Sequence, residues 1–214
     1  MPTYTVKQGD CISSVAYELG FAPRTLWNHP QNAALKEERQ DLHVLFPGDV
    51  LFVPEKQPRV EERPTEARHK FVLKNVQEVL SVRFLRDNIP SAGESYTLIV
   101  DNRVTCTGTL DDDGACLVRI PPASKSACVT LGDPDWGEVY ELKLGHLDPV
   151  EEMSGVRWRL SNLGYLDAPD DNRAGAEGPE LEQAIRAFQL DQQLPTENGL
   201  DDATRQRLKD VHGS

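Results

Sequence analysis

The spacing of apolar residues along this 214-residue chain separates regions that favour different secondary structures. Alternation in YTVKQGD predicts a short strand, and apolar residues three and four apart in CISSVAYELGF predict a helix. APRTLWNHPQNAAL predicts a second helix that breaks at Pro30, and VLFVP after the FPGD turn predicts a returning strand. The expected order over residues 1–55 is therefore strand, helix, helix, strand.

The next two regions have other patterns. Residues 56–69 are charged, contain proline and have few apolar side chains, so a linker without a core is expected there. Over residues 70–146 the period changes to two, with about seven short strand candidates separated by turn residues. This series favours an antiparallel β-sandwich. Its clearest hairpin is RVTCTGTLDDDGACLVRI, in which Asp113 and Gly114 suit a tight turn.

Residues 147–214 have a helical period throughout. Three segments place apolar residues on one face and end or begin at glycine, proline or aspartate, which predicts a three-helix bundle. The apolar positions that carry this prediction are Val150, Val156, Leu160, Leu163, Leu181, Ile185, Phe188, Leu208 and Val211. The expected fold class is therefore multi-domain α+β, comprising a βααβ module, an antiparallel β-sandwich and a three-helix bundle.

The composition of the chain argues against some classes of binding partner. The net charge is −12, which argues against nucleic acid or anionic lipid as a ligand. The chain does not begin with a basic segment followed by an apolar run, and no stretch approaches the ~18 apolar residues of a membrane span. We therefore expect a cytoplasmic protein with no membrane insertion.

The reactive residue types form no recognisable catalytic or metal-binding pattern. The four cysteines (Cys11, Cys106, Cys116 and Cys128) include no CxxC pair, and their spacing to the histidines is unlike that of metal ligands. Cys106 and Cys116 flank the predicted hairpin turn, so both a disulfide and separate thiols are compatible with the sequence. We expect a non-enzymatic protein without a metal or another cofactor.

Residues 4–54 resemble a LysM domain, a small βααβ module that binds glycans containing N-acetylglucosamine. The resemblance rests on YTVKQGD, Val15-Ala16, Leu26, the Pro47-Gly48-Asp49 turn and LFVP, although Cys11 stands where Thr or Ser is usual. It implies a glycan groove, for which the candidates are Gly9, Asp10, Cys11, Ile12, Asn32, Leu45 and Phe46. The alternative is that Asp10 only caps a helix and Ile12 only belongs to the core.

Residues 150–213 resemble the three-helix peptidoglycan-binding domain that often accompanies cell-wall hydrolases. Leu163-Gly164-Tyr165, Ala187-Phe188-Gln189 and Gly199-Leu200 match its pattern. Arg157 replaces the usual glutamine, and DAPDDNRAGAEGPELEQ departs from the usual loop before the second helix. The resemblance implies a second ligand site that includes Tyr165 and Gln189.

The middle region is similar to immunoglobulin-like or transthyretin-like sandwiches, through SYTLIVDNRVTCTGTLDDDG. A chain that combines these three modules resembles accessory proteins of contractile injection systems such as type VI secretion systems. The three resemblances imply a glycan- or peptidoglycan-binding accessory protein that a secretion machine delivers to the periplasm. The alternatives are an adaptor or chaperone that binds a spike or effector protein and has lost sugar binding, and an accessory subunit of a cell-wall hydrolase.

Overall fold

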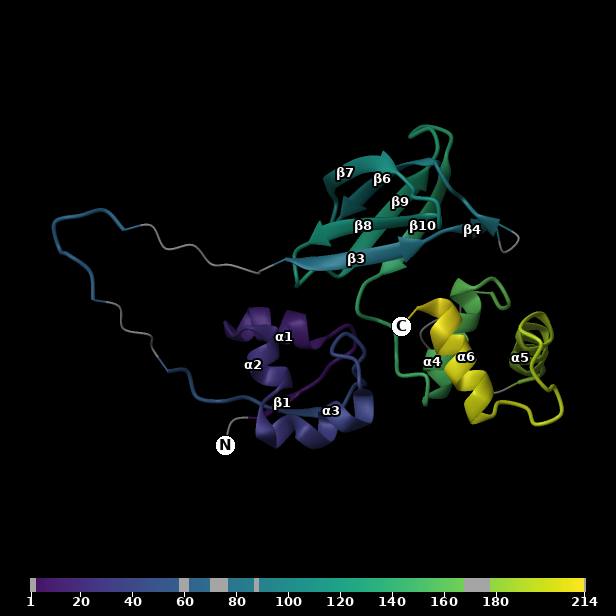
Figure 1. The fold of residues 1–214 in the computed structure, drawn as a ribbon, viewed down its shortest axis with the longest axis horizontal. Helices are drawn as coiled ribbons and strands as arrows, with labels where there is room; N and C mark the ends of the chain where they lie inside the picture. Colours follow the sequence, from purple (N-terminus) through teal and green to yellow (C-terminus); the bar gives the residue numbers. More distant parts are fainter. Residues whose placement is uncertain (1–2, 58–61, 70–76, 87–88, 168–177, 214) are drawn as a thin grey trace. The chain divides into compact units, whose positions relative to one another are not determined.

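The computed structural model describes residues 3–57, 62–69, 77–86, 89–167 and 178–213 (Figure 1). The chain divides into two compact units, one formed by residues 1–4, 12–32 and 51–144 and the other by residues 5–11, 33–50 and 145–214. The domain boundaries expected from the sequence, at 1–55, 56–69, 70–146 and 147–214, stay predictions.

The N-terminal segment contains two short strands with helices between them. In chain order these are β1 (Thr3–Thr5), α1 (Ile12–Leu19), α2 (Pro23–Trp27), the 3₁₀ turn η1 (Pro30–Asn32), α3 (Ala33–Arg39) and β2 (Val50–Phe52), and β1 pairs with β2. The helical segment is interrupted between α2 and η1, as Pro30 predicts. A proline has no amide hydrogen, so it cannot donate the hydrogen bond that would continue the helix. The observed order agrees with the pattern of the sequence, with α3 as a further helix.

Asn32 ties the helical segment to β2. Its side chain is 1% exposed, and its Nδ2 donates to the carbonyl oxygens of Leu26 at 2.9 Å and Phe52 at 3.0 Å. The Phe52 amide donates back to Oδ1 at 2.8 Å. A buried carboxamide is stable only when both of its ends are paired, and here backbone groups supply the partners.

A buried ion pair holds the end of α3 to the turn before β2. Arg39 Nε donates to Oδ2 of Asp49 and Nη2 donates to Oδ1, both at 2.8 Å, and the two side chains are 8% and 9% exposed. Burial by itself would raise the pKa of Asp49, but the bonds from Arg39 and from the Phe46 amide outweigh it, and the pKa is lowered.

The middle region consists of antiparallel strands in several small sheets (Figure 1). The four-stranded sheet has the order β10–β9–β6–β7, and two-stranded sheets are formed by β3 with β8 and by β4 with β5. The strands are β3 (Glu78–Arg83), β4 (Leu85–Arg86), β5 (Ile89–Pro90), β6 (Ser95–Val100), β7 (Arg103–Thr109), β8 (Ala115–Ile120), β9 (Ser126–Leu131) and β10 (Glu138–Lys143).

One hydrophobic core joins the sheets of this region. Alternate residues of β6 and β9 are buried, and so are alternate residues of β8, whose partner strand β3 adds half-buried side chains. The buried set is Phe84, Tyr96, Leu98, Val100, Leu110, Cys116, Val118, Ile120, Ala127, Val129 and Leu131. The alternation predicted by the sequence is confirmed in β3, β6, β8 and β9, and the assignment to a β-sandwich family stays a prediction.

The predicted hairpin between the strands around Asp113-Gly114 is wrong in its pairing. A turn does form, since Oδ1 of Asp111 accepts the amides of Asp113 at 3.0 Å and Ala115 at 2.8 Å. However, β7 pairs with β6 and β8 pairs with β3, so the turn carries the chain from one sheet to another. The reason is Leu110, which is 3% exposed and enters the core where a hairpin would continue its polar loop.

The four cysteines are thiols in this structure, which is the second of the two arrangements that the sequence allows. Cys116 is buried in the core, and burial raises the pKa of its thiol. Cys106 is half-buried, and its Sγ lies 4.0 Å from the hydroxyl of Tyr96.

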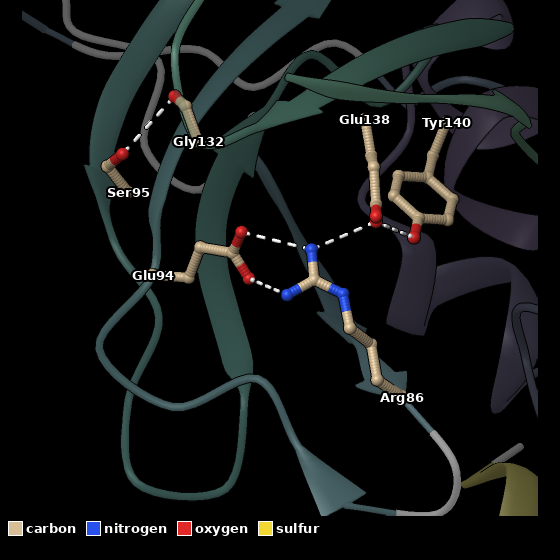
Figure 2. A network of polar contacts seen from close by, with 6 residues as sticks. All are labelled: Arg86, Glu94, Ser95, Gly132, Glu138 and Tyr140. Carbon is tan, nitrogen blue, oxygen red and sulfur yellow. Dashed lines mark hydrogen bonds and ion pairs between the residues drawn. The ribbon is translucent and has the colours of Figure 1, made fainter. Parts of the chain in front are cut away.

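Figure 2 shows a polar network that links β4, β10 and the residue before β6. Arg86 pairs with Glu94 at 3.0 Å and with Glu138 at 3.0 Å, and the Tyr140 hydroxyl donates to Glu138 at 2.8 Å. The hydrogen bonds from Arg86 and then from Tyr140 lower the pKa of Glu138. Because Arg86 and Glu138 are half exposed, this network aligns β4 and β10 and adds little free energy.

The C-terminal region is helical, as its apolar period predicts. It contains α4 (Met153–Asn162), α5 (Pro179–Asp191) and α6 (Asp202–His212), and these helices share one hydrophobic core. Asp201 caps α6 by accepting the Thr204 amide at 2.8 Å, and Gly213 ends that helix with a φ of 88°. Among the described residues, no helix is long and apolar enough to cross a membrane.

The Arg39–Asp49 pair makes a testable contribution to stability. We expect Asp49→Asn to lower the free energy of unfolding at pH 7 by about 3 kcal/mol, because it leaves a guanidinium that is only 8% exposed with the solvent-exposed Glu38 in place of its buried counter-charge. The matched control is Glu38→Gln, which removes a 63% exposed partner of the same arginine and is expected to cost less than about 1 kcal/mol. Urea denaturation measures both, and equal losses would contradict this account.

The same pair predicts an acid-dependent loss of stability. Since the folded state lowers the pKa of Asp49, the unfolded chain binds more protons than the folded chain as the pH falls below about 4. The stabilisation is therefore present at neutral pH and is lost in acid. The Asp49→Asn variant has no carboxyl to titrate, so its unfolding free energy should decline less between about pH 5 and pH 2.

Candidate functional site

A cavity of about 500 Å³ opens on the C-terminal helices. It lies along α5, between the first residue of α4 and the loop that precedes α6. Its apolar lining comes from Met153, Pro179, Leu181, Ile185 and Leu200. This volume falls in the range of ~300–1,000 Å³ that is usual for small-ligand sites.

Helix α5 supplies most of the cavity because of how its residues are spaced. Leu181 and Ile185 are one turn apart on the buried face, and Glu182 and Arg186 are one turn apart beside them on the exposed face. Gly178 and Pro179 begin the helix, and a proline at this position lacks only an amide hydrogen that would be unpaired in any case. One helix therefore provides both an apolar floor and a charged rim.

Gln189 fixes the opposite wall. It is 1% exposed, and its Nε2 donates to the Gly199 carbonyl oxygen at 2.6 Å and to the Thr204 hydroxyl at 2.9 Å. That hydroxyl donates to Asp201 Oδ1 at 2.6 Å, and the bonds from the Thr204 side chain and backbone lower the pKa of Asp201. This chain of hydrogen bonds holds the loop with Thr196 and Leu200 against α5.

Arg159, a buried charged residue, positions the wall of the cavity that contains Met153. The side chain is 1% exposed, and Nη1 donates to the carbonyl oxygens of Asp148 at 2.8 Å and Gly155 at 3.0 Å. Burial lowers its pKa to about 10, so it remains a cation at neutral pH. The guanidinium binds the start of α4 to the segment before it, which sets the position of Met153.

The comparisons with known proteins bear on these same residues. Residues 150–208 match the family model described as "Putative peptidoglycan binding domain". The match spans α4, α5 and most of α6. No curated protein and no solved structure matches the chain. The residues that line the cavity all lie within the matched range, so the cavity is the candidate ligand site of this region.

The two residues predicted as a second ligand site have different positions. Gln189 lines the cavity on α5, whereas Tyr165 is not among the residues that line it. The Tyr165 hydroxyl donates to Asp191 Oδ2 at 2.9 Å, and its ring meets that of Phe188 edge to face at 5.5 Å. Burial and then the bond to Asp191 raise the pKa of Tyr165. Its observed contacts are structural.

The residues predicted for an N-terminal glycan groove have little exposed surface. Ile12 is 0% exposed, Leu45 is 3% exposed, and the amide of Asn32 bonds to backbone groups. The remaining candidates are Gly9 and Asp10, which are buried, and Cys11 and Phe46, which are half-buried. Asp10 accepts the Lys7 amide at 2.9 Å. The set is divided between the two compact units, and its role in glycan binding stays a prediction.

Sequence reasoning missed most of the cavity. Its polar residues Glu182, Gln183, Arg186 and Thr196 were not singled out, although the polar side of the second helix is visible in PELEQAIRAFQLDQ. Glu182 and Arg186 stand four residues apart there, which is the only local signal that they share a face. Within the described ranges, no group of three or more His, Cys, Asp or Glu residues could hold a metal ion.

Gly155 provides a test of the packing that positions Met153. A Cβ at this position would overlap the Pro149 carbonyl oxygen and come within 2.6 Å of that of Asp148. Alanine normally stabilises a helix by about 1 kcal/mol over glycine, but the overlap with backbone costs more. We therefore expect Gly155→Ala to lower the unfolding free energy by about 2 kcal/mol in urea denaturation.

The control is Gly178→Ala, because a Cβ there would have nothing within 4 Å. Its effect should be about 1 kcal/mol or less, from the loss of a glycine at the start of α5. A Gly155→Ala variant as stable as this control would show that the α4 turn is not tightly packed.

Proposed function

We propose that this protein binds peptidoglycan without cleaving it, through the cavity on α5. One observation carries the proposal, namely that a cavity with an apolar floor and a polar rim lies within the residues of the peptidoglycan-binding domain. Peptidoglycan combines neutral sugars, small apolar side chains and charged groups, so a ligand site for it needs both kinds of surface. The other regions would place this domain or hold further partners.

The finer parts of the proposal rest on the order of the modules. We propose that the N-terminal segment is a LysM-like module, supported by strands β1 and β2 with helices between them, and that the middle region is a sandwich-like spacer. An accessory role in a contractile injection system, with delivery from the cytoplasm to the periplasm, follows from the resemblance of the sequence to such proteins.

A specific observation favours a second function, that of an adaptor for a spike or effector protein. Trp136 is 90% exposed, in the turn between β9 and β10. Asp133 holds this turn, since its side chain accepts the Asp135 amide at 2.9 Å and its carbonyl oxygen accepts the Trp136 amide at 3.2 Å. An exposed tryptophan on a fixed turn is typical of a contact with another protein.

The cavity can be tested in the whole chain by filling it. We expect the wild type to co-sediment with purified, insoluble peptidoglycan, and Gln183→Trp to lose at least about tenfold in affinity because an indole on the exposed side of α5 would obstruct the opening. The control is Gln206→Trp, a helical glutamine of α6 that does not line the cavity.

The two variants separate the candidate functions. Equal retention of Gln183→Trp and Gln206→Trp would remove the cavity from the binding reaction. If the wild type itself fails to sediment and a Trp136→Ala substitution instead releases a co-purifying secretion component, the adaptor function replaces the proposed one.

A further inference from the structure

The charged rim of the cavity indicates which part of peptidoglycan it would hold. Arg186 is the cation and Glu182 the carboxylate among the described residues that line it. Both side chains are exposed, and within the described part of the chain neither has a hydrogen-bond or ion-pair partner. Two opposite charges, one turn apart, are therefore available to a ligand.

The availability of Arg186 sets it apart from other arginines of the same domain. Arg159 is buried against backbone carbonyl oxygens, Arg205 donates to the Val150 carbonyl oxygen, and Arg207 donates to Gln192 at 3.0 Å. These three side chains hold the helices and the loops together. Arg186 contributes to no such contact with the residues that the structure describes, and it lines the cavity.

The two components of peptidoglycan differ in charge. Its glycan strands present hydroxyl and acetamido groups, which are neutral, whereas its stem peptides carry carboxylates and, in many bacteria, a free amine. A guanidinium fork pairs best with a carboxylate, through two parallel hydrogen bonds. A neutral glycan would offer nothing to either Arg186 or Glu182.

The apolar floor of the cavity also favours the stem peptide over the glycan strand as the ligand. Its described lining consists of aliphatic side chains and a methionine, with no aromatic ring on which a sugar could stack. The half-buried side chains of Met153 and Leu200 offer a surface suited to the methyl groups of alanine residues, which are abundant in stem peptides, whereas Leu181 and Ile185 are almost fully buried. The volume of about 500 Å³ is that of a short peptide segment.

We propose that the cavity recognises the stem peptide, with Arg186 binding a peptide carboxylate, Glu182 binding a free amine and the aliphatic floor contacting alanyl side chains. This assignment rests on the proposed function and specifies its ligand. On this assignment the glycan strand carries the stem peptides but does not itself bind in the cavity. Because the contacts are ionic and partly exposed, binding should weaken as salt concentration rises.

The experiment measures the binding of the full chain to four probes by calorimetry or co-sedimentation. The probes are intact peptidoglycan, glycan strands from which an amidase has removed the stems and whose freed lactyl carboxyls have been converted to carboxamides, a free stem tetrapeptide that contains diaminopimelate, and the same peptide with its carboxyls converted to carboxamides. We expect binding to the first and third, with a loss of about tenfold or more for the second and fourth.

Substitutions of Arg186 and Glu182 test which charged group of the peptide each residue binds. Arg186→Gln should weaken binding of the free tetrapeptide about tenfold, Arg186→Lys should restore part of it, and Lys209→Gln on α6, which removes a cation that does not line the cavity, should leave it unchanged. Glu182→Gln should weaken binding of the tetrapeptide but not of one whose two amines, at the N-terminus and on diaminopimelate, are acetylated. Thermal unfolding confirms that each exposed substitution leaves the fold intact.

The outcomes distinguish the two proposals. Equal binding of intact peptidoglycan and stem-free glycan strands would overturn recognition of the stem and leave peptidoglycan binding in place. Failure of all four probes would overturn the proposed function as well. Tetrapeptide binding that is unaffected by Arg186→Gln would overturn the role of Arg186.

Discussion

The hydrogen bonds of Gln189 are the constraint on which the candidate site depends. This buried carboxamide reaches from α5 to the Gly199 carbonyl oxygen and the Thr204 hydroxyl, and Thr204 in turn bonds to the capping residue Asp201. Buried polar groups must be paired, so the loop before α6 has one position that satisfies all of them. These bonds hold against α5 the loop that supplies Thr196, Gly199 and Leu200 to the cavity.

The same helix therefore serves stability and recognition on different sides. Leu181 and Ile185 face the core, where Arg159 and the α6 contacts hold α4 in place. Glu182 and Arg186 face solvent, where no structural contact uses their charges within the described residues. A core that is complete without these two residues leaves them available to a ligand, which is the physical basis of the proposed recognition of stem peptides.

Two polar residues elsewhere in the chain use their side chains for contacts within the protein. Asn32 and Asp49 are the residue types that bind sugars, yet their side chains bond to backbone groups and to Arg39. Both are buried, and burial of an unpaired amide or carboxylate would cost more than a surface ligand contact returns. Exposure therefore separates the two roles more reliably than residue type does.

The sequence by itself determined the type of each element, because hydrophobic period, proline positions and helix caps act over a few residues. The break at Pro30, the alternation of β6 and β9 and the three C-terminal helices all follow from such local rules. It did not determine that β7 and β8 lie in different sheets, since burial of Leu110 depends on distant strands. Nor did it show the cavity, because Met153, Arg186 and Leu200 come together only when the helices pack and Gln189 fixes the loop.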